Sequence, residues 1–164
     1  NEARIDSLTG LLNRRAVFSL LATTPLKAGD AAIAFDLDGF KAINDTHGHA
    51  AGDRVLEEFA NILRSLVGES GLTARLGGEE FLVVMRDMSN FRTLAIADAI
   101  RERLSAFTFD GNAGPFQTTT SAGIAFFTLA DREFDVVFQR ADAALYRAKG
   151  LGRNRVCTEL QVVA

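Results

Sequence analysis

The stretch RLGGEEFLVVM, which begins at Arg75, constrains the fold more than any other part of the chain. Two glycines stand between the segments Leu72–Leu76 and Glu80–Met85, whose apolar and β-branched side chains are typical of strands. Glycine adopts the positive φ angles that a tight turn requires. The stretch therefore predicts an antiparallel hairpin that carries two adjacent carboxylates, Glu79 and Glu80, at its tip.

The elements around this hairpin follow from the spacing of apolar residues. In residues 53–66 and 134–148 they recur at helical spacing, which is typical of helices with one buried face, and two further helices are marked less sharply. The helix candidates are Arg14–Leu21, Asp53–Leu66, Leu94–Leu104 and Phe134–Ala148, and the remaining strand candidates are Ala31–Asp36, Thr118–Phe127 and Arg155–Thr158. The order β-α-β-β-α-β with additional helices predicts an α+β fold with a ferredoxin-like core.

Length, charge and cysteine content exclude several classes of protein. The chain has 164 residues, of which 48% are hydrophobic, and no long linker, so residues 1–164 are expected to form one domain. The net charge of −3 leaves no broad basic surface, which argues against binding to a nucleic acid polymer. No apolar run approaches the roughly 18 residues of a membrane span, so no membrane contact is expected. The single Cys157 favours a reducing cytoplasm.

A second group of acidic residues lies where the first buried strand is expected to end. Asp36 and Asp38 alternate with Leu37, so both carboxylates project to one side. The central strands of a split β-α-β sheet lie side by side, so Asp36 and Glu79 are expected to converge. Two carboxylates, a backbone carbonyl and water are the oxygen ligands that Mg²⁺ prefers, usually beside substrate phosphates.

Three basic residues are placed to serve a polyphosphate near these acids. Lys41 follows a turn that contains Gly39, and Lys149 and Arg153 stand at the end of the last predicted helix. The sequence contains no Gly-x4-Gly-Lys-Ser/Thr segment, so a P-loop is not the phosphate cradle.

Each of these features also has an ordinary structural interpretation. An Asp-x-Asp at a strand end is more often a solvated turn or a helix cap than a metal site, and Gly-Gly-Glu-Glu alone is a hairpin with surface acids. Lys149 and Arg153 at a helix C-terminus would also complement the helix dipole. His47 and His49 do not share a helix face, so loop hydrogen bonding or substrate contact is favoured over metal ligation.

The combination of motifs is more specific than its parts, and it resembles the GGDEF family, the diguanylate cyclases. The motifs cover nearly the whole chain, in the order DSLTGLLNRR from Asp6, FDLDGFKAINDTHGHAAGD from Phe35, GGEEF from Gly77, SAGIA from Ser121 and ADAALYRAKGLGRN from Ala141. The resemblance implies a fold similar to adenylyl cyclases and polymerase palms. It also implies condensation of two GTP molecules into cyclic di-GMP with release of pyrophosphate.

The resemblance assigns roles to individual positions of this chain. Asp36, the Leu37 carbonyl and Glu79 match the ligands of Mg²⁺, for which Mn²⁺ can substitute. Glu79 is also the candidate base for the ribose 3′-hydroxyl, and Glu80 is an accessory acid. Lys41 is the third catalytic position and stabilises developing charge. The substrate-binding positions are Asn44 and Asp53 for guanine, Phe40 and His49 for the pocket lining, and Lys149 and Arg153 for phosphates.

One departure from the family pattern concerns inhibition by the product. Many members carry an Arg-x-x-Asp motif before the hairpin, and the matching positions here are Gly68 and Gly71. The usual inhibitory site is therefore expected to be absent.

Three interpretations of the whole chain follow from the resemblance. The favoured one is an active cyclase domain that works as a homodimer, because one chain carries one metal-ligand set and one guanine-reading set. A catalytically idle module that binds GTP or cyclic di-GMP is the main alternative, and a cyclase that acts on a single nucleotide is a weaker one. The chain begins at Asn1 with no initiating Met, so we expect it to be the C-terminal module of a longer signalling protein.

Overall fold

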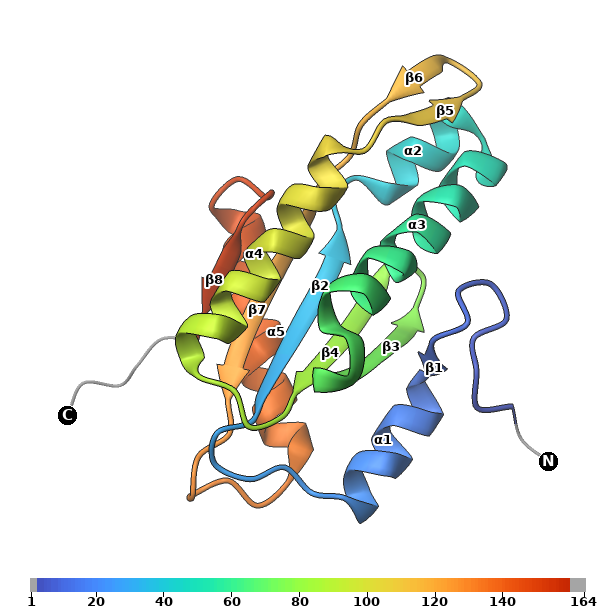
Figure 1. Cartoon of the computed structure of the whole chain (residues 1–164). Coiled ribbons are helices and arrows are strands. Elements are labelled where there is room, and N and C mark those ends of the chain that lie inside the picture. Colours follow the sequence, from blue (N-terminus) through green and yellow to red (C-terminus); the bar gives the residue numbers. More distant parts are fainter. Residues whose placement is uncertain (1–2, 160–164) are drawn as a thin grey trace.

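A mixed sheet runs through the centre of the molecule and carries helices on both faces (Figure 1). The computed structural model describes residues 3–159, and within them the six-stranded sheet has the order β1-β3-β4-β2-β7-β8. The strands of this sheet are β1 (Leu12–Asn13), β2 (Ala31–Leu37), β3 (Gly71–Gly77), β4 (Glu80–Met85), β7 (Thr120–Phe126) and β8 (Val156–Thr158). The helices are α1 (Arg14–Thr23), α2 (Phe40–His47), α3 (His49–Val67), α4 (Asn90–Ala106) and α5 (Phe134–Gly150), and Gly68–Ser70 forms a short 3-10 turn.

The sheet places β2 at its centre. It pairs antiparallel with β4 on one side and with β7 on the other, and β3 pairs antiparallel with β4. Every residue of β2 is buried, because helices cover both faces at this point. This arrangement confirms the predicted α+β fold, and the central strands lie side by side as the split β-α-β order requires.

Two apolar layers hold the helices on the sheet. The layer on one face joins α3 and α4 to alternate strand residues such as Phe35 and Phe81. The layer on the other face joins α1 and α5 to the residues between them, including Ala34 and Leu82. Side chains alternate between the faces along each strand, so the two layers divide as the period of two predicts.

The predicted hairpin is confirmed, and its tip is held in place by the N-terminal segment. Gly77 and Gly78 have φ angles of 140° and 51°, and the register shifts by a bulge just before the turn. Arg75 donates from Nε to the Gly78 carbonyl at 3.0 Å and from Nη1 to the Asp6 carboxylate at 3.2 Å. Burial raises the pKa of Asp6, but hydrogen bonds from Thr9 and Arg75 outweigh it and hold that pKa below its ordinary value.

The structure corrects the sequence prediction where elements are short or begin at a glycine. Lys41 follows the turn at Gly39 as predicted, but it lies in the first turn of a helix, α2, that was not predicted; this helix starts directly after Gly39, whose φ is 62°. Only Ile43 of this helix is buried, so α2 shows no apolar stripe in the sequence. The next helix begins at His49 rather than Asp53.

A small second hairpin also escaped prediction. Strands β5 (Phe109–Gly111) and β6 (Gly114–Phe116) pair antiparallel outside the main sheet, above the junction of α2 and α3 (Figure 1). His47 stacks on Phe116 with ring centroids 4.0 Å apart, and its backbone oxygen accepts from the Asn112 amide at 3.1 Å. Strands this short carry no readable alternation. Within residues 3–159, none of the helices is long and apolar enough to cross a membrane.

Candidate functional site

Asp36 lies near the end of β2, where its carboxylate is almost completely buried. Its relative exposure is 7%, and its Oδ2 accepts a hydrogen bond from the Lys149 ammonium at 2.6 Å. Burial raises the pKa of Asp36 above its ordinary value; Lys149 acts in the opposite direction, and Glu79 and Glu80 add to the increase. Because the pKa is raised overall, the ion pair with Lys149 does not offset the free-energy cost of ionising a buried carboxyl beside two other acids.

A pocket of about 200 Å³ opens beside Asp36, between the end of β2, the tip of the β3–β4 hairpin and the end of α5. It is lined by Asp36, Leu37, Asp38, Gly39, Phe40, Lys41, Glu79, Lys149 and Arg153. Seven of the residues that the sequence assigned to a site therefore share one pocket, although they come from three separate regions of the chain. The two glutamate positions differ in their relation to it.

Glu79 stands in the turn of the hairpin and is partly buried against the end of β2. Its backbone oxygen accepts from the Leu37 amide at 3.1 Å, which fixes the turn beside the residue after Asp36. Glu80 is exposed, pairs with Asp36 in the strand register and does not line the pocket. Of the two, Glu79 has the larger effect on the pKa of Asp36. Asp36 and Glu79 thus form the acidic pair at this pocket.

The donor set at this pocket fits a hard divalent cation. Among the described residues no cluster of three or more His, Cys, Asp or Glu side chains is arranged to bind a metal by itself. Asp36 and Glu79, which carry two carboxylates, line the pocket, and so does Leu37, whose backbone carbonyl is the third candidate oxygen ligand. Mg²⁺ is usually held by one or two carboxylates while water and substrate phosphates complete its octahedron, so a two-carboxylate site suits it.

Asp38, the second aspartate of the Asp-x-Asp pair, is engaged differently from Asp36. One carboxylate oxygen accepts from Ser121 Oγ at 2.7 Å, and the other accepts from Thr119 Oγ1 at 2.7 Å and from the Asn154 amide at 3.1 Å. These partners lie on or beside β7 and in the loop after α5. Both oxygens are therefore already hydrogen-bonded within the protein, a role that the sequence prediction missed.

The residues assigned to a guanine base lie on α2 and α3. A Cβ at Gly52 would stand 1.9 Å from Asn44 Oδ1 and 3.3 Å from Phe40 Cζ, so only glycine lets these two side chains lie against α3. This close approach was missed at the sequence level, because the predicted helix began at Asp53 and left Gly52 outside. Asp53 follows directly and is exposed, and its carboxylate forms no hydrogen bond or ion pair with any of residues 3–159.

His49 and Asp53 also line a wider cleft between α3 and the β5–β6 hairpin. Its volume is about 820 Å³, and its other wall includes Asp110 and Asn112. His49 and Asp53 line this cleft and not the acidic pocket, whereas Phe40 lines the acidic pocket and lies, like Asn44, against Gly52. Of the two residues assigned to guanine, Asp53 therefore lines the wider cleft, and Asn44 lines neither cavity.

The fold and the acidic pocket define the class: a palm-like α+β domain of the kind found in nucleotide cyclases. The family model described as "Diguanylate cyclase, GGDEF domain" matches residues 3–155. The GGDEF domain of DgcB from Caulobacter crescentus, solved in complex with c-di-GMP, superposes with a TM-score of 0.89 at 31% identity and 96% coverage of both chains. The active GGEEF domain of a diguanylate cyclase from Vibrio cholerae superposes with a TM-score of 0.79 at 31% identity, covering 93% of this chain and 99% of that one.

Curated relatives give the same family. The probable diguanylate cyclase DgcF of Escherichia coli strain K12 is 36% identical over 95% of this chain and 51% of its own length. Diguanylate cyclase DgcP of Pseudomonas aeruginosa is 40% identical over 94% of this chain and 24% of its own length. The chain belongs to the GGDEF diguanylate cyclase family, and it spans about half or less of these two relatives.

Proposed function

We propose that this chain is the catalytic domain of a diguanylate cyclase, which condenses two GTP molecules into cyclic di-GMP and releases two pyrophosphates. The observation that carries the proposal is the pocket where Asp36 and Glu79 meet three cationic side chains, Lys41, Lys149 and Arg153. Nucleotidyl transfer needs both carboxylates that bind a metal ion and cationic side chains that bind the triphosphate. The names of the relatives agree with this activity.

In this proposal the acidic pair and the cations divide the work on the nucleotide. Asp36, Glu79 and the Leu37 carbonyl would hold Mg²⁺, which would neutralise charge on the triphosphate and lower the pKa of the attacking hydroxyl. Lys149 and Arg153 contact the phosphates, and Lys41 stabilises the charge that develops as pyrophosphate leaves. Phosphoryl transfer depends on positioning and electrostatic stabilisation more than on covalent catalysis, and these charged groups contribute to both.

The reaction itself joins a ribose oxygen to phosphorus. The 3′-oxygen of one GTP attacks the α-phosphorus of the other in line, the bond to the pyrophosphate oxygen breaks, and Glu79 accepts the hydroxyl proton. The 3′-oxygen of the second nucleotide then attacks the α-phosphorus of the first in the same way. A second pyrophosphate leaves, and the ring closes. Glu80, exposed at the hairpin tip, serves as an accessory acid near the incoming nucleotide.

Base choice follows from the chemistry of Asn44 and Asp53. A carboxylate accepts hydrogen bonds from the N1–H and the 2-amino group of guanine, and an amide can pair with another edge of the base. Adenine lacks that pair of donors. The Asp53 carboxylate, which has no partner among residues 3–159, is available for this purpose, and Gly52 leaves room for Asn44.

Catalysis in this proposal needs two copies of the domain. One chain offers one acidic pair and one guanine-reading pair, whereas the product contains two guanosines joined by two phosphodiester bonds. Two domains that face each other around a two-fold axis would each present one GTP to the other. A segment outside this chain that holds two copies together would raise their effective concentration, so the chain alone is expected to be slow when dilute.

The test is to incubate the chain with GTP and Mg²⁺ at several protein concentrations and to identify the products by mass. The proposal predicts cyclic di-GMP, no cyclic product from ATP, and a specific activity that rises with protein concentration. Fusion of a parallel coiled-coil dimer before Asn1 is expected to raise the activity of the dilute chain. Binding of GTP without any product, at every concentration and in the fused dimer, would instead identify a catalytically idle receptor module.

A further inference from the structure

Asp38 is an acidic residue of the FDLD segment to which the proposed mechanism assigns no role. It lines the acidic pocket, but its three hydrogen-bond donors, Thr119, Ser121 and Asn154, all belong to the protein. In addition, its backbone amide donates to the Thr119 carbonyl at 2.8 Å. A carboxylate bound in this way joins segments of the chain.

One of the segments that hydrogen-bond to Asp38 is the loop after α5. Arg153 and Asn154 have φ angles of 64° and 48°, a left-handed conformation that is uncommon for residues other than glycine, although asparagine adopts it more readily than most. Such a conformation persists only where surrounding contacts hold it. The loop is therefore expected to depend on its anchors.

Two side chains anchor Asn154, one at its backbone and one at its side chain. Its backbone amide donates to Asp38 Oδ2 at 3.1 Å, and its side-chain Oδ1 accepts from Arg101 Nη1 of α4 at 2.9 Å. Arg101 is itself held by Asp98, with Nε to Oδ1 at 2.8 Å. Of these anchors, Asp38 is the one that comes from the segment carrying Asp36 and Leu37.

We propose that Asp38 is a positioning residue for the triphosphate, which holds the loop at Arg153 and Asn154 in register with Asp36. The bond from the Asn154 amide to Asp38 sets the distance between the Arg153 guanidinium, which lines the pocket, and the carboxylate two residues before Asp38. This inference rests on the proposed function of the pocket, and it assigns Asp38 a role through hydrogen-bond geometry rather than through its charge.

Substitution by asparagine and by glutamate separates geometry from charge. In Asp38→Asn the amide oxygen can still accept from Thr119 and Asn154 while the amide nitrogen donates to the Ser121 hydroxyl, which rotates to accept. Asp38→Glu keeps the charge but adds a methylene and displaces the loop. Asp38→Ala removes all three bonds. Thr119→Val is the matched control, because it removes one donor to the same oxygen and leaves the loop bond in place.

The measurement is equilibrium binding of 3′-deoxy-GTP with Mg²⁺, since this nucleotide carries the triphosphate but lacks the attacking hydroxyl. We expect Asp38→Ala and Asp38→Glu to bind it about tenfold or more weakly, and Asp38→Asn and Thr119→Val to stay within about threefold of the parent chain. Guanosine, which has no phosphates, is the second probe and is expected to bind all variants alike. In an Arg153→Ala background, Asp38→Ala should cost little further affinity.

Three results would overturn the inference. Asp38→Asn as weak as Asp38→Ala would indicate a role of the charge, and equal losses for guanosine and 3′-deoxy-GTP would indicate general damage to the fold. Additive losses with Arg153→Ala would show that the two residues act separately. If Asp38→Ala does not fold, the contrast between Asp38→Asn and Asp38→Glu decides the question. Failure of the parent chain to bind 3′-deoxy-GTP at all would count against the proposed function instead.

Discussion

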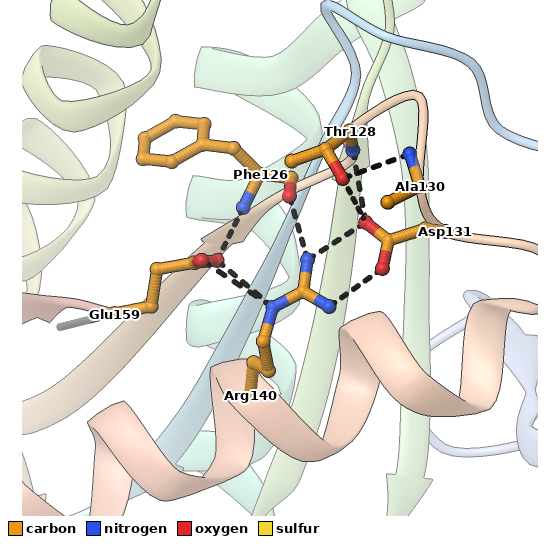
Figure 2. A network of polar contacts seen from close by, with 6 residues as sticks. All are labelled: Phe126, Thr128, Ala130, Asp131, Arg140 and Glu159. Atoms are coloured by element: carbon orange, nitrogen blue, oxygen red, sulfur yellow. Dashed lines mark hydrogen bonds and ion pairs between the residues drawn. The ribbon is translucent and has the colours of Figure 1, made fainter. Parts of the chain in front are cut away.

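Helix α5 carries Arg140 in its first half and Lys149 near its end, and the surroundings of these two cations differ. Arg140 joins a network in which each charged group has a partner (Figure 2). Its guanidinium pairs with both oxygens of Asp131 at 2.8 and 2.9 Å, donates to the Phe126 carbonyl at 2.8 Å and contacts Glu159 at 3.3 Å. The Thr128 amide also donates to Asp131, and these bonds lower the pKa of that carboxyl to about 2.

Near its end, Lys149 faces a group of acids that it does not balance. Its only ion pair among the described residues is with Asp36, while Glu79 and Glu80 stand close enough to raise the pKa of that carboxyl further. Burial is the largest cause of the increase. The same helix thus contributes to one network in which ionisation is favoured and to one pocket in which it is opposed.

The difference separates a cluster that is compensated within the protein from the pocket to which we assign a function. Around Arg140 the protein itself supplies the compensating charge, so the network ties β7, α5 and the end of the described chain together. Around Asp36 the compensation is incomplete, which costs stability unless a ligand supplies positive charge. Titratable groups with shifted pKa values in a pocket are candidates for function for this reason.

The largest expected effect comes from removing charge at the acidic pocket. Glu79→Gln keeps the shape of the side chain but removes a charge that the proposed cation needs, so product formation should fall on the order of a thousandfold or more. The fold is expected to stay intact, as judged by circular dichroism and thermal unfolding. Turnover close to that of the parent chain in a folded Glu79→Gln protein would refute the metal assignment.

Base recognition is expected to respond less strongly. Asp53→Ala leaves the guanine N–H donors without an acceptor, so GTP binding should weaken by about 1 to 3 kcal/mol. ATP binding should barely change, because adenine lacks those donors, and titration calorimetry with both nucleotides gives the comparison. An equal loss for GTP and ATP would show that Asp53 does not read the base.

A substitution in the Arg140 network should have the opposite effect: it should lower the free energy of unfolding and leave catalysis unchanged. Asp131→Asn removes a carboxylate whose folded pKa is about 2 against an ordinary value of 3.8. A shift of this size corresponds to about 2 kcal/mol of unfolding free energy at pH 7, measured by urea unfolding. Loss of activity in a variant that remains folded would break the division between the two regions.

The pH dependence of that difference has a definite sign. Because the folded pKa of Asp131 is lowered, its contribution to stability is present above the ordinary value of 3.8 and is lost as the pH falls towards about 2. The parent chain and Asp131→Asn should therefore converge in stability between about pH 5 and pH 2. Parallel stability curves throughout that interval would mean that the ion pair is not the cause.

The smallest expected effect is at the 3-10 turn before β3. Gly68 and Gly71 offer neither a guanidinium nor a carboxylate for a bound product, so no inhibitory site is expected there. Cyclic di-GMP should inhibit only in competition with GTP, and mutation near Gly68 should leave that inhibition unchanged. Inhibition that excess GTP cannot overcome, and that a substitution at Gly68 abolishes, would contradict this expectation.

The hairpin and the long helices could be predicted because their signals are local. Two adjacent glycines define the turn, and one apolar face predicts residues 53–66 of the nineteen-residue helix α3. Helix α2 could not be predicted, because a single buried residue, Ile43, leaves no stripe to detect. The β5–β6 hairpin depends on contacts such as the stacking of His47 on Phe116, which exist only once the chain has folded.

The sequence predicted which acids lie together at the candidate site, but not the hydrogen bonds and the ion pair that hold its residues in place. Asp36 and Glu79 stand beside recognisable turns, so strand adjacency alone brings them together. The work of Asp38 depends on partners more than eighty residues away, Thr119, Ser121 and Asn154, and no spacing pattern reveals them. The same holds for Lys149, whose ion pair with Asp36 spans 113 positions.

The central claim is that the acidic pocket lacks positive charge that a divalent cation supplies, whereas the Arg140 network does not. The most direct measurement is Mn²⁺ binding to the nucleotide-free chain, followed by the electron paramagnetic resonance signal of free Mn²⁺. We expect Asp131→Asn to bind Mn²⁺ as the parent chain does and Asp36→Asn to bind at least about tenfold more weakly, since it loses one of two carboxylate ligands. Equal Mn²⁺ affinity in Asp36→Asn and the parent chain would contradict the account.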